Sequence, residues 1–108
     1  MKRDIKKYQF FKKLCILPFI DTIYLFGSRA RGDFRERSDI DLAIECPQAT
    51  KKDWSQVMAI IENADTLLSI DCVRLDMLNN NALLEEINAH KILMFERKKN
   101  DTKKKTQS

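Results

Sequence analysis

Three stretches of the chain space their apolar residues as one face of a helix does. The first spans residues 4–16, where apolar side chains lie opposite a Lys-rich face and Pro18 marks the end. The second follows Thr50, a residue type that favours the start of a helix, and the third follows the Asn run at 79–81. We therefore expect three amphipathic helices.

Short apolar runs lie between these stretches, and their length predicts strands. They cover residues 23–26, 39–45, 69–75 and 92–95. In the second run apolar residues alternate with acidic or small ones, so one face is apolar and the other carries the acids. The order of these elements predicts a small mixed β-sheet of about four strands with helices packed on it, in the α/β (α+β) class.

Composition indicates one ordered domain with charged ends. The 108 residues are 44% hydrophobic and include only two Gly and two Pro, which excludes a wholly disordered or collagen-like chain. Residues 1–13 and 97–108 each carry a net charge of +5, whereas residues 14–96 carry −6. Because no aliphatic or aromatic residue follows Phe95, we expect a domain over 1–96 and a basic, disordered tail over 97–108.

No targeting signal is expected. No apolar run approaches the roughly 18–20 residues of a membrane helix. The highly charged start, residues 1–7, does not match the apolar core of a signal peptide. The three Cys residues form no C-x-x-C pair and are typical of reduced thiols. We expect a cytoplasmic protein without a membrane partner.

Gly27 and Ser28 directly follow a predicted strand and precede a possible helical turn. A Gly lets a bulky anion approach the backbone, and the start of a helix presents amide groups to a phosphate. The Ser28 hydroxyl adds a donor. Arg29 or Arg31 can add positive charge, although a solvated loop would also explain both arginines. The sequence therefore predicts nucleotide-phosphate binding at this turn by Gly27, Ser28, Arg29 and Arg31.

Asp39 and Asp41 alternate along the second predicted strand and so point to one face. Two carboxylates that close resist ionising together unless a cation lies between them, and hard oxygen ligands favour Mg²⁺ or Mn²⁺. Asp71 lies mid-strand among apolar neighbours, where a lone carboxylate is unfavourable. If the two strands are neighbours, three carboxylates meet in a two-metal site for phosphoryl or nucleotidyl transfer. Asp76 falls on the opposite face by parity, so we prefer Asp71 as the third ligand.

The spacing of these motifs resembles a known family. Gly27-Ser28, ten residues and then Asp39-Ile40-Asp41 match the G-S-x₁₀-D-x-D signature of the nucleotidyltransferase superfamily that includes DNA polymerase beta. The run from Gly27 to Leu42 is similar to that of the minimal nucleotidyltransferases, the MNT group. The resemblance covers roughly residues 20–96, and it implies the nucleotidyltransferase fold.

The resemblance also implies roles for the site residues. In such proteins the turn at Gly27 and Ser28 holds the nucleotide triphosphate. Asp39 and Asp41 would bind Mg²⁺, with two ions expected and Mn²⁺ as an alternative. Asp71 would be a further metal ligand and the general base that activates the acceptor hydroxyl.

A partner follows from the same resemblance. Many minimal nucleotidyltransferases are antitoxins that transfer AMP from ATP to a tyrosine of a small helical HEPN-domain ribonuclease and so silence it. We therefore expect a Mg-dependent protein adenylyltransferase that acts on a HEPN-family toxin and does not require nucleic acid. Larger superfamily members carry an extra helical domain that grips the acceptor. These 108 residues leave no room for such a domain, so we expect another molecule to position the acceptor.

Two other functions stay open at this point. A catalytically idle relative could neutralise its partner by binding alone, although the complete set of acids and the Gly-Ser turn argue against loss of activity. A nucleic-acid binder could use the basic ends, but their only aromatic residues are Tyr8, Phe10 and Phe11, which helical spacing places mostly in the core.

Overall fold

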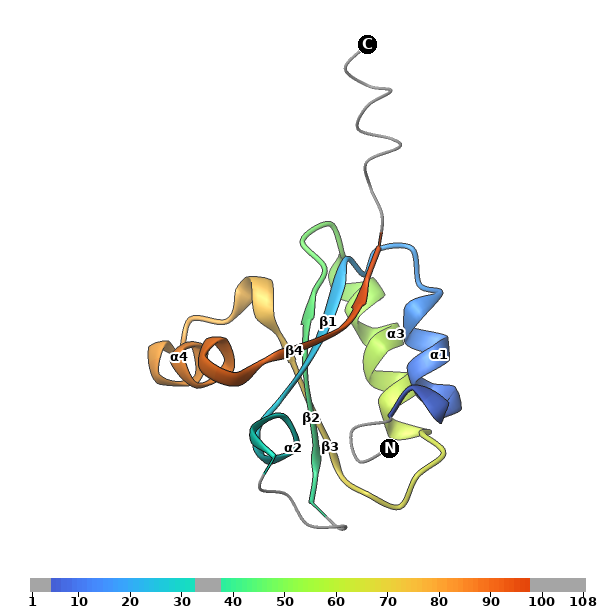
Figure 1. The fold of residues 1–108 in the computed structure, drawn as a ribbon. Coiled ribbons are helices and arrows are strands. Elements are labelled where there is room, and N and C mark those ends of the chain that lie inside the picture. Colours follow the sequence, from blue (N-terminus) through green and yellow to red (C-terminus); the bar gives the residue numbers. More distant parts are fainter. Residues whose placement is uncertain (1–4, 33–37, 98–108) are drawn as a thin grey trace.

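The computed structural model describes residues 5–32 and 38–97, which form one four-stranded sheet with helices on both faces (Figure 1). In chain order the elements are η1 (Ile5–Lys7), α1 (Gln9–Cys15), β1 (Thr22–Phe26), α2 (Ser28–Arg31), β2 (Ile40–Glu45), α3 (Lys51–Glu62), β3 (Ile70–Arg74), η2 (Leu75–Met77), α4 (Asn81–His90) and β4 (Ile92–Glu96). The predicted mixed sheet and its packed helices are confirmed.

The strands lie in the order β3-β2-β1-β4. β1 is antiparallel to β2 and to β4, whereas β2 and β3 are parallel. A parallel pair needs a crossover connection, and α3 supplies it between β2 and β3. The strand of Asp39 and Asp41 is therefore a neighbour of the strand of Asp71, as the sequence interpretation required.

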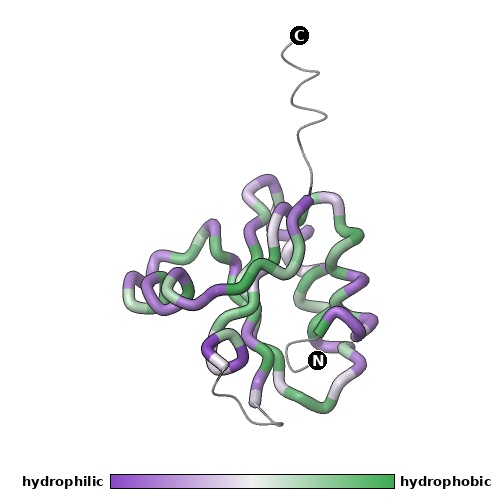
Figure 2. Tube along the Cα trace, in the orientation of Figure 1, coloured by the Kyte–Doolittle hydropathy of each residue, from purple (hydrophilic) through white to green (hydrophobic). Residues whose placement is uncertain are grey.

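The alternation of side chains separates two packed layers. On one face, α1 and α3 cover a core that includes the fully buried Leu25, Leu42 and Ile44. On the other face, α2 and α4 lie over a smaller cluster around Phe26, Ala43 and Ile87. Figure 2 shows the central strands as mostly hydrophobic, with hydrophilic positions gathered on the helices and turns. Because Asp41 alternates with Leu42, it belongs to the second face.

The predicted helix over 4–16 is divided in the structure. A 3₁₀ turn at Ile5–Lys7 precedes Tyr8, whose backbone is extended, and the α-helix begins at Gln9. The two carboxylate oxygens of Asp65 accept hydrogen bonds from the backbone N–H groups of Gln9 and Phe10, at 2.9 and 3.0 Å. The start of α1 is thus capped by a residue from the loop after α3, which no local pattern indicates.

The folded part continues one residue beyond the predicted boundary. Arg97 was assigned to the tail, yet its guanidinium donates hydrogen bonds to three backbone carbonyls, at 2.7–2.9 Å, and its N–H donates to Asp21 O. The three acceptors belong to Cys15, Leu17 and Ile20. Arg97 therefore joins the end of β4 to the segment after α1. The rest of the predicted tail, 98–108, lies outside the described residues.

Across residues 5–32 and 38–97, none of the helices combines the length and apolar character needed to cross a membrane.

Candidate active site

The turn after β1 depends on a glycine at position 27. Gly27 has φ +75°, and its carbonyl accepts hydrogen bonds from the N–H groups of Ala30 and Arg31, both at 3.0 Å. The short helix α2 begins at Ser28 and ends at Arg31, and Gly32, which follows it, also has a positive φ. The predicted helical turn after Gly27-Ser28 is therefore present.

This turn packs directly on one of the predicted acids. A Cβ added to Gly27 would overlap Oδ2 of Asp41 and would lie 2.9 Å from its Cγ. The register agrees, because Phe26, the residue before Gly27, pairs with Asp41 across β1 and β2. Only a glycine allows the carboxylate this close to the backbone. The two halves of the sequence motif thus meet in space.

Asp41 also meets Asp71. The two residues lie opposite each other in the parallel register of β2 and β3. The pKa of Asp41 is raised to about 6, mainly by burial and then by the nearby carboxyls of Asp71 and Asp39, against the opposing charge of Arg31. A cation beside these carboxyls would oppose this effect, because positive charge favours the ionised form of each acid.

Asp39 lies at the exposed edge of this group. It precedes β2, which begins at Ile40, one residue later than the sequence pattern predicts. Within the described ranges, no three His, Cys, Asp or Glu side chains form a ready-made metal-binding group. The structure therefore brings Asp41 and Asp71 together, and the charge of Asp39 acts on Asp41. Adjacent hard oxygen donors that repel one another suit a divalent ion such as Mg²⁺.

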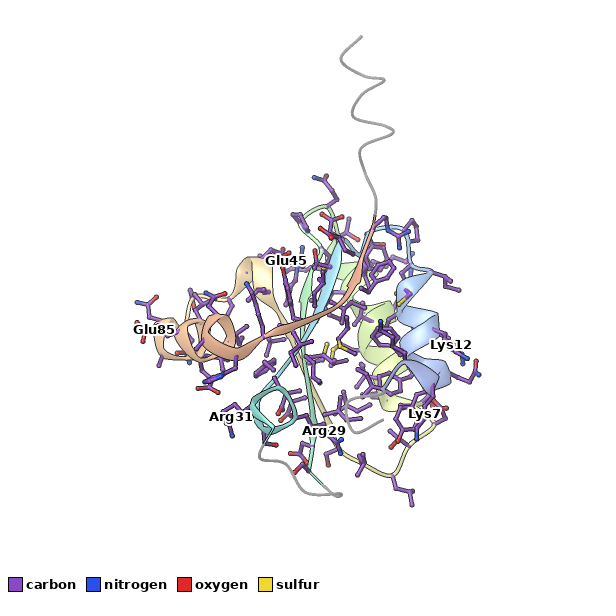
Figure 3. All side chains as sticks on the ribbon, in the orientation of Figure 1. Lys7, Lys12, Arg29, Arg31, Glu45 and Glu85 are labelled. Atoms are coloured by element: carbon purple, nitrogen blue, oxygen red, sulfur yellow. The ribbon has the colours of Figure 1, made fainter. Side chains whose placement is uncertain are left out.

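The two predicted arginines have different surroundings (Figure 3). Nη1 of Arg31 forms an ion pair with Oε2 of Glu86 at 2.8 Å, which links α2 to α4 at a half-exposed position. Arg29 is only 6% exposed, and its guanidinium donates to the backbone carbonyls of Ser38 and Asp39. Sequence reasoning missed Glu86, because no local pattern relates two residues 55 positions apart.

Asp76, the alternative third acid, lies at the other end of the strands. Its Oδ1 accepts from the N–H of Cys46 at 2.7 Å, and its Oδ2 accepts from Nε of Arg74 at 3.1 Å. Arg74 in turn donates to the carbonyls of Cys46 and Ala49. Asp76 is therefore a structural residue that joins the end of β3 to the loop after β2, and the preference for Asp71 agrees with this arrangement.

Comparison with known proteins identifies relatives of this fold. The sequence profile of the family described as "Polymerase beta, Nucleotidyltransferase" matches residues 9–100. A candidate protein adenylyltransferase of Methanocaldococcus jannaschii, MJ1379, is 35% identical over 51 residues, which make up 47% of this chain and 51% of that protein. The chain thus matches about half the length of this curated relative.

Two solved structures have a similar fold. One is a toxin–antitoxin complex with AMP-PNP (TM-score 0.53, 20% identity), in which the match covers 83% of this chain and 71% of the other. The second is a tri-AMPylated Shewanella oneidensis HEPN toxin in complex with an MNT antitoxin (TM-score 0.53, 19% identity, 84% of this chain and 73% of the other).

Proposed function

Because the chain belongs to the polymerase beta nucleotidyltransferase family, we propose that it transfers AMP from ATP to a hydroxyl group of a protein partner. The single observation that carries this proposal is the contact of Asp41 with both Asp71 and the Gly27 turn. It joins a group of acids suited to a divalent ion to a turn suited to phosphate. Nucleotidyl transfer requires both at one place.

The proposed reaction is an in-line attack on the α-phosphate of ATP. The acceptor oxygen forms a bond to the α-phosphorus while the bond to the β-phosphate oxygen breaks and pyrophosphate leaves. Asp71 accepts the proton of the acceptor hydroxyl as the general base. Gly27 and Ser28 bind the triphosphate, and the charge of Arg31 lies near the same acids.

Asp39, Asp41 and Asp71 would hold two Mg²⁺ ions, with Mn²⁺ as an alternative. A bound Mg²⁺ supplies positive charge for the phosphate oxygens as negative charge develops on the leaving group. Asp71 on β3 and Asp41 on β2 contribute a rigid geometry, since neighbouring strands fix both backbones. Rigid placement of this kind is what positions reacting groups for transfer.

The proposed partner is a small helical toxin of the HEPN family, and the proposed acceptor is a tyrosine hydroxyl. Support comes from the structure of an AMPylated HEPN toxin bound to an MNT antitoxin. This chain shares the fold of that antitoxin. The chain would thus act as an antitoxin in the cytoplasm, with ATP as its substrate and without nucleic acid.

Labelled ATP tests the reaction class. We expect the partner to gain label from ATP labelled at the α-phosphate, and to gain none when the label is at the γ-phosphate. Asp41→Asn should abolish this transfer, whereas Glu62→Gln, which removes an equal charge from the exposed end of α3, should retain it. Label from the γ-phosphate would indicate phosphoryl transfer. Neutralisation of the toxin without any label would indicate a binding-only antitoxin.

A further inference from the structure

Arg29 lies buried between the phosphate turn and the start of β2. Its Nε donates to the carbonyl of Ser38 at 3.2 Å and to that of Asp39 at 3.3 Å, and its Nη2 donates to Ser38 O at 2.9 Å. Hydrogen bonds from a charged donor are stronger than those between neutral groups. A residue adjacent to Ser28 in sequence thus holds the backbone that carries Asp39.

The carbonyls that Arg29 contacts lie just before the first paired residue of β2. The pairing of β2 with β3 begins at Ile40, whose N–H donates to Ser69 O at 2.9 Å. Asp39 precedes this ladder and is exposed. The sheet therefore fixes Asp41 directly, whereas the backbone at Asp39 is held from the side of α2 by Arg29.

We propose that Arg29 is a positioning residue rather than the nucleotide ligand that the sequence suggested. Its guanidinium sets the position of Asp39 relative to Asp41 and to the turn at Gly27, and thereby sets the affinity of the acids for a divalent ion. Replacing a residue that orients a metal ligand without touching the metal commonly changes the metal affinity about 10–100-fold. The part of the proposal that concerns the ion rests on the proposed function.

The chemistry of arginine makes this role testable. A planar guanidinium can donate to two neighbouring carbonyls at once, whereas the ammonium of lysine is a compact point charge on a flexible stem. Arg29→Lys therefore keeps the positive charge but loses the planar set of donors that reaches both carbonyls. A residue that served only as a charge for phosphate would tolerate this change better than one that fixes a backbone.

Arg97 offers a matched control at the opposite end of the sheet. It too donates to several backbone carbonyls, those of Cys15, Leu17 and Ile20. It follows β4, whose last residue Glu96 pairs with Thr22 at the start of β1, whereas Gly27 follows the end of β1. Arg97→Lys should therefore destabilise the fold without changing the position of the acids or their affinity for a divalent ion.

The first measurement is the binding of Mn²⁺ alone, without nucleotide, by calorimetry well below the melting temperature of each variant. We expect Arg29→Lys to weaken Mn²⁺ binding about tenfold or more, and Arg97→Lys to bind as the wild type does. Equal Mn²⁺ affinity in Arg29→Lys and wild type, together with weaker binding of ATP, would show that Arg29 contacts phosphate and would overturn the proposal.

The second measurement is hydrogen exchange in the protein without ligands, which does not depend on the proposed function. We expect faster exchange of the amides at the start of β2, at Ile40 and Asp41, in Arg29→Lys but not in Arg97→Lys. Unchanged exchange there would overturn the positioning role. If wild type binds no Mn²⁺ while exchange still rises in Arg29→Lys, the proposed function fails and the positioning of the strand stands.

Discussion

Asp41 and Asp71 lie opposite each other in the parallel strands β2 and β3, close enough that Asp71 raises the pKa of Asp41. Asp41 also lies against the backbone of Gly27, where no side chain would fit. The arrangement is unfavourable for two bare carboxylates at neutral pH and favourable once a cation is present. Stability without metal and activity with metal should therefore respond in opposite ways to changes at this pair.

Asp41 should make the metal-free protein less stable as the pH rises. Its pKa is raised from 3.8 to about 6 in the folded chain, so the unfolded chain loses this proton first as pH increases. Asp41→Asn mimics the protonated form, so its melting temperature should equal that of wild type well below pH 3.8 and exceed it increasingly up to about pH 7. Thermal melts in a chelating buffer across this range measure the difference. A difference in melting temperature that does not change with pH would contradict the raised pKa of Asp41.

Gly27→Ala should damage both the fold and the site. The positive φ costs a non-glycine residue about 1–2 kcal/mol, and the new Cβ would displace the carboxylate of Asp41. Gly32→Ala shares the positive φ at the end of α2 and controls for the backbone cost. We expect both variants to melt lower, but only Gly27→Ala to lose stabilisation by added Mn²⁺. Equal stabilisation of the two variants by Mn²⁺ would show that Gly27 does not influence metal binding by the acids.

Asp65→Ala should destabilise the protein without affecting catalysis. Hydrogen bonds from the backbone N–H groups of Gln9 and Phe10 lower the pKa of Asp65, so its contribution is present above its ordinary pKa and is lost as the pH falls through the lowered one. The melting temperature should fall at pH 7, and the gap to wild type should narrow in acid. Transfer per folded molecule should stay at the wild-type level, with Glu62→Gln as an exposed control.

Two truncations should locate the C-terminal boundary of the fold. Removal of 98–108 deletes no aliphatic or aromatic residue and should leave the melting temperature nearly unchanged. Removal of 97–108 also deletes Arg97 and should lower the melting temperature. The charged hydrogen bonds of Arg97 to three carbonyls are worth roughly 1.5–3 kcal/mol each at most. Equal melting of the two truncated proteins would show that Arg97 contributes nothing. Loss of transfer in the shorter deletion would place the basic segment in the site.

The site was predictable where it depends on strand periodicity. Alternation along 39–45 assigns Asp41 to one face of a strand, and an acid among apolar residues singles out Asp71. The cost of burial expected for Asp71 does not arise, because its side chain is exposed in the structure. These local patterns require only that the strands be neighbours, which the structure confirms. The Gly-Ser turn was predictable for a similar reason, since Gly27 directly follows an apolar run.

The remaining contacts depend on tertiary structure and leave no local trace. Arg29 could have been a solvated residue, a phosphate ligand or a buried donor to the backbone, and only the position of Asp39 relative to α2 distinguishes these roles. Asp65 caps a helix that begins 56 positions earlier in the chain. Arg97 falls in a run of basic residues that composition alone assigns to a tail.

Covalent modification distinguishes an adenylyltransferase from a protein that only binds its partner, and intact-mass spectrometry of the partner detects it. The partner toxin is co-expressed with wild type, with Asp71→Asn and with Glu62→Gln, and is then weighed after purification. We predict a mass increase of one or more AMP units with wild type and with Glu62→Gln, and none with Asp71→Asn. An unmodified partner that wild type and Asp71→Asn neutralise equally well would contradict this prediction and identify a binding-only antitoxin.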